Sequence, residues 1–184
     1  MTITKTPIDG LIILNPRVFK DDRGYFFESY NAVTFSNLVG YEVNFVQDNQ
    51  SYSTKGVLRG LHLQKGEFSQ AKLVRVTKGE VLDVAVDLRS GSPTYGQYHS
   101  VLLTEENNSQ FFIPRGFAHG FIVLSDEAVF QYKCDNYYSK EAESGLHYAD
   151  PDLNIDWQMD TSNVIVSDKD LELPFLKNAP DFGF

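Results

Sequence analysis

The stretch GEVLDVAVDLR, residues 79–89, indicates the fold more clearly than any other segment of the chain. Its apolar side chains at even positions, from Leu82 to Leu88, alternate with a second set that includes Asp83 and Asp87. Successive side chains of a β-strand point to opposite faces of the sheet, so a packed face produces a period of two. The stretch therefore predicts a β-strand with one packed face.

Segments of the same kind, rich in Val, Leu, Ile, Phe and Tyr, continue on both sides of this strand. Gly, Pro, Asn, Asp and Ser separate them at intervals typical of all-β proteins. Eight such strands without long helices between them predict an all-β fold, a double-sheet barrel or jelly roll. The other seven cover residues 43–50, 56–64, 71–77, 98–104, 110–116, 119–125 and 128–134.

Helical signals are confined to the margins. NAVTFSNLVG begins with the capping residue Asn31 and ends at Gly40, and SKEAESG, from Ser139, predicts a second short helix. The polar tail after Trp157 is expected to wrap the surface, and Cys134 to be a buried wall residue.

Length and composition indicate one globular domain over residues 1–184. No apolar run approaches the roughly 20 residues that a membrane-spanning helix needs, and the N-terminus lacks the pattern of a secretory signal. A cytoplasmic location without membrane attachment is therefore predicted. The net charge of -9 argues against nucleic acid as a partner. A single cysteine excludes an intrachain disulfide and a four-thiolate zinc site.

His62 stands alone in the largely apolar strand GVLRGLHLQ. A single histidine in a strand is ordinarily a core residue satisfied by a hydrogen bond. Here Gly60 leaves space beside the ring, Arg59 supplies a cation, and Lys72 follows in the next strand, a cluster that favours an anionic ligand. Strand alternation places Arg59 and His62 on opposite faces, so both can reach one site only if the strand bulges near Gly60 or if Arg59 approaches from the barrel rim.

The spacing of Gly56, His62 and Gln64, followed by Pro114-x-Gly116-x-x-His119, resembles the two motifs of the cupin superfamily. In that superfamily the first motif normally continues His-x-His and helps to bind a divalent metal. Gln64 occupies the place of the second histidine, and a carboxamide is a poor transition-metal ligand. The resemblance therefore implies a cupin barrel without a metal, in which His62 is free to act as a general base.

A more specific resemblance runs in register over nearly the whole chain. Each fragment is weak by itself, but so many in order are strong: the chain resembles the dTDP-4-dehydrorhamnose 3,5-epimerase family. The matching segments are FKDDRGYFFES (19–29), FVQDN (45–49), GVLRGLHLQ (56–64), QAKLVRV (70–76), GEVLDVAVDLR (79–89), IPRGFAHGF (113–121), DNYYS (135–139) and SDKD (167–170).

The family's reaction converts dTDP-4-keto-6-deoxy-D-glucose to dTDP-4-keto-L-rhamnose in dTDP-L-rhamnose biosynthesis. The 4-ketone acidifies the hydrogens on C3 and C5, so no metal, nicotinamide or flavin cofactor is needed. The resemblance implies that His62 is the base, oriented by Asp170. It also implies that Tyr132 donates a proton on the opposite face and that Lys72 stabilises the enolate oxygen.

The resemblance also implies a dTDP-sugar site and a homodimer, in which the N-terminal segment, within residues 1–50, completes the neighbouring subunit's site. Charge-assisted bonds from Arg and Lys suit the diphosphate, and Tyr138 corresponds to the aromatic that stacks on thymine. The implied substrate-binding residues are Phe19, Arg23, Glu28, Gln47, Asn49, Arg59, Lys72, His119, Tyr138, Glu143 and Lys169.

Other readings of the same residues stay open. Relatives that epimerise only C3 or only C5, or that isomerise a related keto-sugar nucleotide, share the motifs. The chain departs from many family members at Leu63 and around KGEFSQAK (65–72). A silent sugar-nucleotide binder should lack His62 or Asp170, and both are present. A metal-dependent cupin oxygenase is disfavoured by Gln64.

Overall fold

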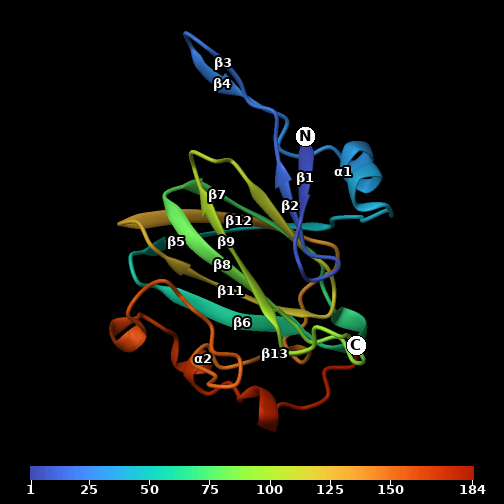
Figure 1. The fold of residues 1–184 in the computed structure, drawn as a ribbon, viewed down its shortest axis with the longest axis vertical. Coiled ribbons are helices and arrows are strands. Elements are labelled where there is room, and N and C mark those ends of the chain that lie inside the picture. Colours follow the sequence, from blue (N-terminus) through green and yellow to red (C-terminus); the bar gives the residue numbers. More distant parts are fainter.

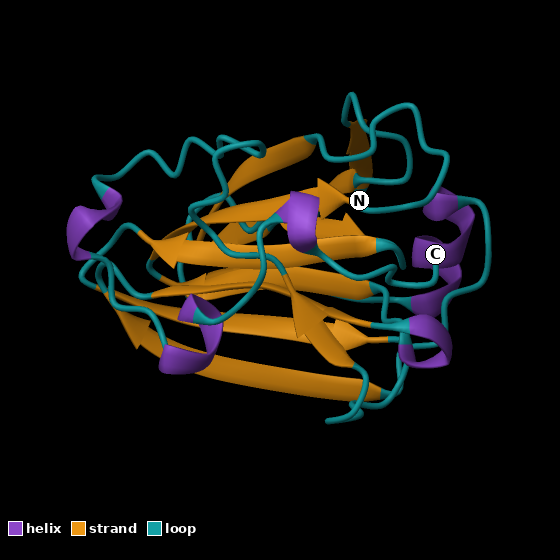
Figure 2. Ribbon diagram, turned by 90° about the horizontal axis from the view of Figure 1, so that it is seen from below, coloured by secondary structure: helices purple, strands orange, loops and turns teal.

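A computed structural model describes all 184 residues. Two antiparallel sheets pack face to face into a flattened barrel, with short helices at its margins (Figures 1 and 2). In spatial order the six-stranded sheet contains β1 (Thr2–Lys5), β2 (Ile12–Asn15), β10 (Gln110–Ile113), β7 (Lys72–Lys78), β12 (Glu127–Cys134) and β5 (Gln47–Thr54). The five-stranded sheet contains β13 (Glu143–Gly145), β6 (Leu58–Gln64), β11 (Phe117–Val123), β8 (Glu80–Asp87) and β9 (Tyr98–Thr104).

The predicted all-β fold is confirmed, and each of the eight predicted segments contains a strand. The first of them starts later than predicted, because Val43 packs beneath a helix and β5 begins only at Gln47. The sequence interpretation missed the N-terminal pair β1 and β2, of which β2 pairs with β10.

The prediction of one packed face for the strand at 79–89 is wrong, because β8 is buried on both faces. Val81 and Ala85 lie in the core between the two sheets. Leu82 and Val84 lie on the other face, which is covered by the C-terminal tail through residues such as Trp157. The tail therefore wraps the five-stranded sheet as predicted, and buries its outer face.

The helix predicted from Asn31 is confirmed as α1 (Ala32–Val39). The Asn31 side chain accepts a hydrogen bond from Thr34 N at 3.1 Å, and Gly40 ends the helix at φ 89°. Phe35 is its buried residue and packs against Phe112, so α1 covers one end of the outer face of the six-stranded sheet.

The second predicted helix, from Ser139, is wrong. Its last residues form β13, in which Glu143 pairs with Gln64 and Gly145 pairs with His62. The free edge of β6 offers backbone hydrogen bonds that a short isolated helix cannot match. The helical turns of the tail are α2 (Asp168–Leu171), η2 (Thr161–Asn163) and η3 (Leu176–Asn178), and η1 (Gly66–Phe68) follows β6.

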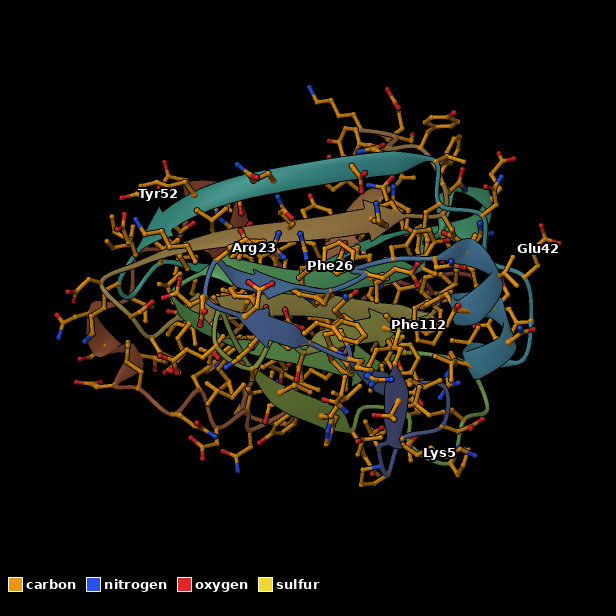
Figure 3. All side chains as sticks on the ribbon, turned by 90° about the horizontal axis from the view of Figure 1, so that it is seen from above. Lys5, Arg23, Phe26, Glu42, Tyr52 and Phe112 are labelled. Carbon is orange, nitrogen blue, oxygen red and sulfur yellow. The ribbon has the colours of Figure 1, made fainter.

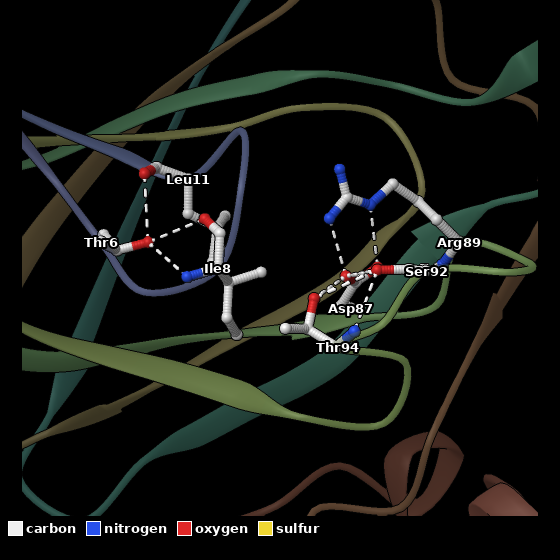
Figure 4. A network of polar contacts seen from close by, with 7 residues as sticks. All are labelled: Thr6, Ile8, Leu11, Asp87, Arg89, Ser92 and Thr94. Atoms are coloured by element: carbon white, nitrogen blue, oxygen red, sulfur yellow. Dashed lines mark hydrogen bonds and ion pairs between the residues drawn. The ribbon is translucent and has the colours of Figure 1, made fainter.

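The end of β8 is fixed by a polar network around Asp87 (Figure 4). The buried Asp87 carboxylate accepts hydrogen bonds from the Arg89 guanidinium at 2.7 and 2.9 Å and from the hydroxyls of Ser92 and Thr94, both at 2.6 Å. Arg89 also stacks over the Phe117 ring. This network holds the turn after β8 in one conformation.

A two-stranded arm, β3 (Phe19–Asp21) and β4 (Gly24–Phe26), projects from the barrel (Figure 1) and carries Arg23 and Phe26 (Figure 3). None of the helices is long and apolar enough to cross a membrane.

Candidate active site

A cavity of about 620 Å³ opens between the two sheets on the side of β5 and β6, where the C-terminal tail forms one wall. It brings together six of the predicted catalytic or binding residues from the two sheets and two from the tail. These are Asn49, Arg59, His62, Lys72, His119 and Tyr132, with Lys169 and Asp170 from the tail.

Of the two ways to bring Arg59 and His62 into one site, the bulge near Gly60 is present. β11 pairs His119 with His62 but Phe121 with Arg59, so the register shifts between these pairs. Gly60 has φ 122°, and a Cβ atom there would lie 2.6 Å from Gly120 Cα. Glycine alone fits this close approach, and the bulge lets both Arg59 and His62 line the cavity.

His62 is paired with Asp170 at an Nε2–Oδ1 distance of 2.7 Å. The other carboxylate oxygen accepts the Gly60 N–H at 3.1 Å, so the strand and α2 hold Asp170 from two sides. Burial alone would raise the pKa of Asp170, but the hydrogen bonds from His62 and Gly60 outweigh it and lower that pKa. Asp170 is therefore an anion that orients His62, and the second ring nitrogen makes no hydrogen bond within the protein.

A second histidine–aspartate pair lies deeper. His119 Nε2 is 2.9 and 3.0 Å from the two carboxylate oxygens of Asp83, which is fully buried. Burial lowers the pKa of His119, so its neutral ring donates to the carboxylate. Burial also lowers the pKa of Lys72, and the charges of Cys134, Asp83 and Glu143 oppose that shift. Lys72 is thus a half-buried amine whose charge depends on its acidic neighbours.

Tyr132 enters the cavity from β12, whereas His62 enters from β6 of the other sheet. Burial raises the pKa of the Tyr132 phenol, the nearby Cys134 raises it further, and Arg59 opposes both. The phenol is therefore a protonated group that faces the cavity.

At the rim, Lys169 lines the cavity and is joined to Glu143 and Tyr138, which lie beside it. The Tyr138 hydroxyl donates to Glu143 Oε2 at 2.7 Å, and Lys169 forms an ion pair with Glu143. Burial alone would raise the pKa of Glu143, but the hydrogen bonds from Lys169 and Tyr138 lower it. The Tyr138 ring is half exposed and free to stack on a planar ligand.

On β5, Gln47 donates to Asn49 Oδ1 at 2.9 Å, so Gln47 reaches the cavity only through Asn49. Arg59 Nε donates to Ser53 Oγ at 3.1 Å. Three predicted binding residues lie apart from the cavity, on the arm or beside it: Phe19, Arg23 and Glu28. Arg23 pairs with Asp21 within the arm, and Glu28 accepts a hydrogen bond from Asn31 at 3.2 Å.

Comparisons with known proteins identify the family of this chain. The family model described as dTDP-4-dehydrorhamnose 3,5-epimerase matches residues 5–178. The chain belongs to this family. It is 53% identical to the dTDP-4-dehydrorhamnose 3,5-epimerase of Escherichia coli K12 over 173 residues, which cover 94% of this chain and 93% of that protein.

Two solved structures extend the likeness to three dimensions. The dTDP-4-dehydrorhamnose 3,5-epimerase of Elizabethkingia anophelis NUHP1 superposes with a TM-score of 0.93 at 53% identity, covering 96% of this chain and 97% of that one. The dTDP-6-deoxy-D-glucose-3,5-epimerase of Legionella pneumophila, in complex with dTDP-4-keto-L-rhamnose, gives 0.93 at 50% identity, covering 97% and 94%. The predicted family, its cupin-type barrel and its isomerase class are confirmed.

Gln64, which departs from the metal-binding cupin motif, has a structural role in this epimerase. Its side chain is buried, and its Oε1 accepts the Ser139 N–H at 2.9 Å, which fixes the chain next to Tyr138. No three His, Cys, Asp or Glu side chains converge as metal ligands.

The sequence interpretation missed three polar groups of the epimerase site. Asp83 could have been found from the sequence, because a carboxylate in a strand of Val, Leu and Ala needs a hydrogen-bonding or charged partner. Ser167 caps α2 and accepts the Asp170 N–H at 3.2 Å, and SDKD carried that signal. Ser51 also lines the cavity, and nothing in the sequence around it indicated this.

Proposed function

We propose that His62, Asp170, Tyr132 and Lys72 carry out the reaction of this epimerase in the cavity between the two sheets. The chain catalyses epimerisation at C3 and C5 of dTDP-4-keto-6-deoxy-D-glucose, which gives dTDP-4-keto-L-rhamnose. The observation that supports these roles best is the 2.7 Å His62–Asp170 pair, set in the same cavity as a protonated tyrosine from the facing sheet.

The reaction starts when His62 takes the proton from C3 or C5. The electron pair of the broken C–H bond moves into the ring and places negative charge on the C4 oxygen, giving an enolate. The imidazolium that forms is stabilised by Asp170. Tyr132 then donates its phenolic proton to the opposite face of the same carbon, and the enolate collapses to the ketone with inverted configuration. Before the second carbon reacts, the imidazolium loses a proton to solvent and the Tyr132 phenolate regains one from it.

Lys72 stabilises the enolate oxygen. An ammonium in a site from which water is largely excluded interacts strongly with a developing oxyanion. The lowered pKa of Lys72 makes its charge sensitive to neighbours, and the buried Asp83 keeps an acidic group close to it. This arrangement supplies a cation where the mechanism needs one.

The nucleotide end of the substrate occupies the rim. Arg59 and Lys169 bind the diphosphate, His119 and Asn49 contact the sugar end, and Tyr138 stacks on thymine. Gln47 supports Asn49, and Glu143 holds Tyr138 and Lys169. Charge-assisted hydrogen bonds to phosphate explain how a protein of net charge -9 binds an anion.

The active form is a homodimer in which the arm of one subunit completes the site of the other with Phe19, Arg23 and Glu28. Phe19 is 50% and Phe26 70% exposed in the single chain, an aromatic surface that an isolated monomer leaves in water. Co-expressing His62→Ala with Arg23→Ala tests this, because a mixed dimer regains one intact site. Activity no higher than that of the two variants alone would exclude an arm that acts on the neighbouring subunit.

Proton NMR in deuterated water tests the reaction itself, with purified, chelator-treated protein and dTDP-4-keto-6-deoxy-D-glucose. Deuterium should enter at both C3 and C5. Exchange at one carbon would indicate a single-site epimerase, and no exchange would leave a binder of sugar nucleotides.

In Tyr132→Phe, exchange should persist in part while the inverted product disappears. An unchanged product yield in that variant would remove Tyr132 from the mechanism.

A cytoplasmic location and the absence of nucleic-acid binding stay predictions from composition.

A further inference from the structure

Ser51 Oγ is the one buried side-chain oxygen or nitrogen of the chain without a hydrogen-bond partner in the protein. Buried polar groups are almost always paired, so each exception calls for an explanation. Ser51 lines the cavity together with His62 and Tyr132; its Oγ is covered by protein in this structure, and a rotation about χ1 would present the hydroxyl to a ligand in the cavity.

Its neighbours on the inner face of β5 are both paired. Asn49 accepts from Gln47 and donates to Cys134 Sγ, and Ser53 Oγ accepts from Arg59. Ser51 lies between them, ~7 Å from each along the strand. The side chains of Asn49 and Ser53 therefore have hydrogen-bond partners within the protein, whereas the Ser51 hydroxyl between them has none.

The pairing of β5 with β12 also shows where Ser51 lies relative to Tyr132 and Arg59. Asn49 is the cross-strand partner of Tyr132, and Ser51 is that of Phe130. Residues opposite each other in an antiparallel pair lie on the same face, so one end of this row is next to the proposed proton donor. The other end, Ser53, holds Arg59, the proposed ligand of the diphosphate. Ser51 thus lies between the reacting carbons and the diphosphate.

The substrate has few groups in that interval. C1 carries the diphosphate and C3 and C5 react, so only C2 with its hydroxyl and the ring oxygen lie between them. The C2 hydroxyl keeps its configuration throughout the reaction, whereas the C3 hydroxyl changes position. A hydrogen bond to the C2 hydroxyl can therefore hold the ring during both inversions.

We propose that Ser51 Oγ binds the C2 hydroxyl of the sugar and is a positioning residue that selects 2-hydroxy over 2-deoxy keto-sugar nucleotides. This inference rests on the proposed function, because it needs the sugar between Tyr132 and Arg59. Ser51 takes no part in proton transfer: it fixes the ring so that C3 and C5 meet His62 and Tyr132.

The test compares wild type and Ser51→Ala on the substrate and on its 2-deoxy analogue. In wild type the analogue should lose about tenfold in kcat/KM, which corresponds to one hydrogen bond. Ser51→Ala should lose about tenfold on the normal substrate and nothing further on the analogue, since both changes remove the same contact. Its affinity for dTDP, which has no sugar ring at this position, should stay unchanged.

Melting temperature separates this role from a structural one. Removing an unpaired buried hydroxyl should leave the melting temperature of Ser51→Ala unchanged or raise it slightly. Ser109→Ala is the matched control, because Ser109 Oγ is bonded to Asn15 at 3.0 Å outside the cavity. That variant should lower the melting temperature and leave kcat/KM unchanged for both substrates.

Equal losses on both substrates in Ser51→Ala, or no loss on either, would overturn the inference. Wild type that releases inverted product from the normal substrate would meanwhile keep the proposed function intact. Wild type inactive on the normal substrate would overturn the proposed function, and the inference with it.

Discussion

Asp83 and Asp87 lie on the same strand and the same face, and both side chains are fully buried, but their partners differ. Asp83 has one hydrogen-bonding partner, His119, at the wall of the cavity. Asp87 accepts hydrogen bonds from Arg89, Ser92 and Thr94 at the other end of the strand. Two carboxylates that are equally hidden from solvent thus differ in the number of groups that donate hydrogen bonds to them.

The pKa values move in opposite directions as a result. Burial raises the pKa of Asp83, and its attraction to His119 and Lys72 opposes that shift only in part. Burial alone would also raise the pKa of Asp87, but the donors from Arg89, Ser92 and Thr94 hold it well below its usual range. The donors around a carboxylate, together with its depth below the surface, decide whether it anchors the fold or remains responsive to its surroundings.

The largest effect is expected where a carboxylate serves a catalytic partner. In His62→Ala the cavity keeps Asp170 but loses the proposed base, so C–H exchange should fall by about 10²–10⁴-fold. Affinity for dTDP should be nearly unchanged, because the proposed mechanism has His62 contact the sugar and not the nucleotide. His99→Ala, on β9 and outside the cavity, is the control and should exchange normally. Deuterium exchange followed by NMR measures both, and retained exchange in His62→Ala would remove it as the base.

Asp87→Asn should lower stability and leave activity unchanged. The amide cannot accept from Arg89, Ser92 and Thr94 together, so the free energy of unfolding should fall by about 2 kcal/mol. Because this network lies away from the cavity, kcat/KM should stay close to the wild-type value. Denaturant unfolding measures the expected loss of stability, and steady-state kinetics measure the expected unchanged kcat/KM. A comparable loss of activity without loss of stability would contradict the assignment of Asp87 to the fold.

Acid should reveal the same network in wild type. The folded pKa of Asp87 is lowered, so the native state stays ionised where the unfolded chain, with an ordinary value of about 3.9, already takes up a proton. The stabilisation is complete above about pH 5 and is lost as pH falls below about 4. Thermal melting of wild type and Asp87→Asn from pH 7 to 3 should show curves that converge in acid. A constant difference down to pH 3 would contradict the lowered pKa.

The fold was largely predictable from the sequence because strand periodicity is a local signal. Asn31 and Gly40 likewise set the ends of α1 through bonds within the same turns. The segment from Ser139 failed because its conformation depends on the free edge of β6, which no local pattern encodes. Burial of both faces of β8 depends on the distant tail and was missed for the same reason.

The site divides in the same way. His62 and Lys72 stood out as polar residues in apolar strands, but the His62–Asp170 pair joins residues 108 positions apart and came only from the family resemblance. The bulge at Gly60 was one of two ways to bring Arg59 and His62 together, and strand alternation could not decide between it and an approach from the barrel rim. Ser51 was invisible, because a serine in a strand gives no sign of whether its hydroxyl is paired.

The smallest change in stability is expected for Asp83→Asn. The amide oxygen still accepts from His119, and the charge it replaces is disfavoured by burial, so the free energy of unfolding should change by less than about 1 kcal/mol. The loss of negative charge should lower the pKa of Lys72, which Asp83 normally raises. The alkaline limb of the kcat/KM profile should therefore move to lower pH, while that of Asp87→Asn should not move. If Asp83→Asn were instead as destabilising as Asp87→Asn, with an unshifted profile, burial alone would explain both carboxylates and the distinction drawn from their donors would fail.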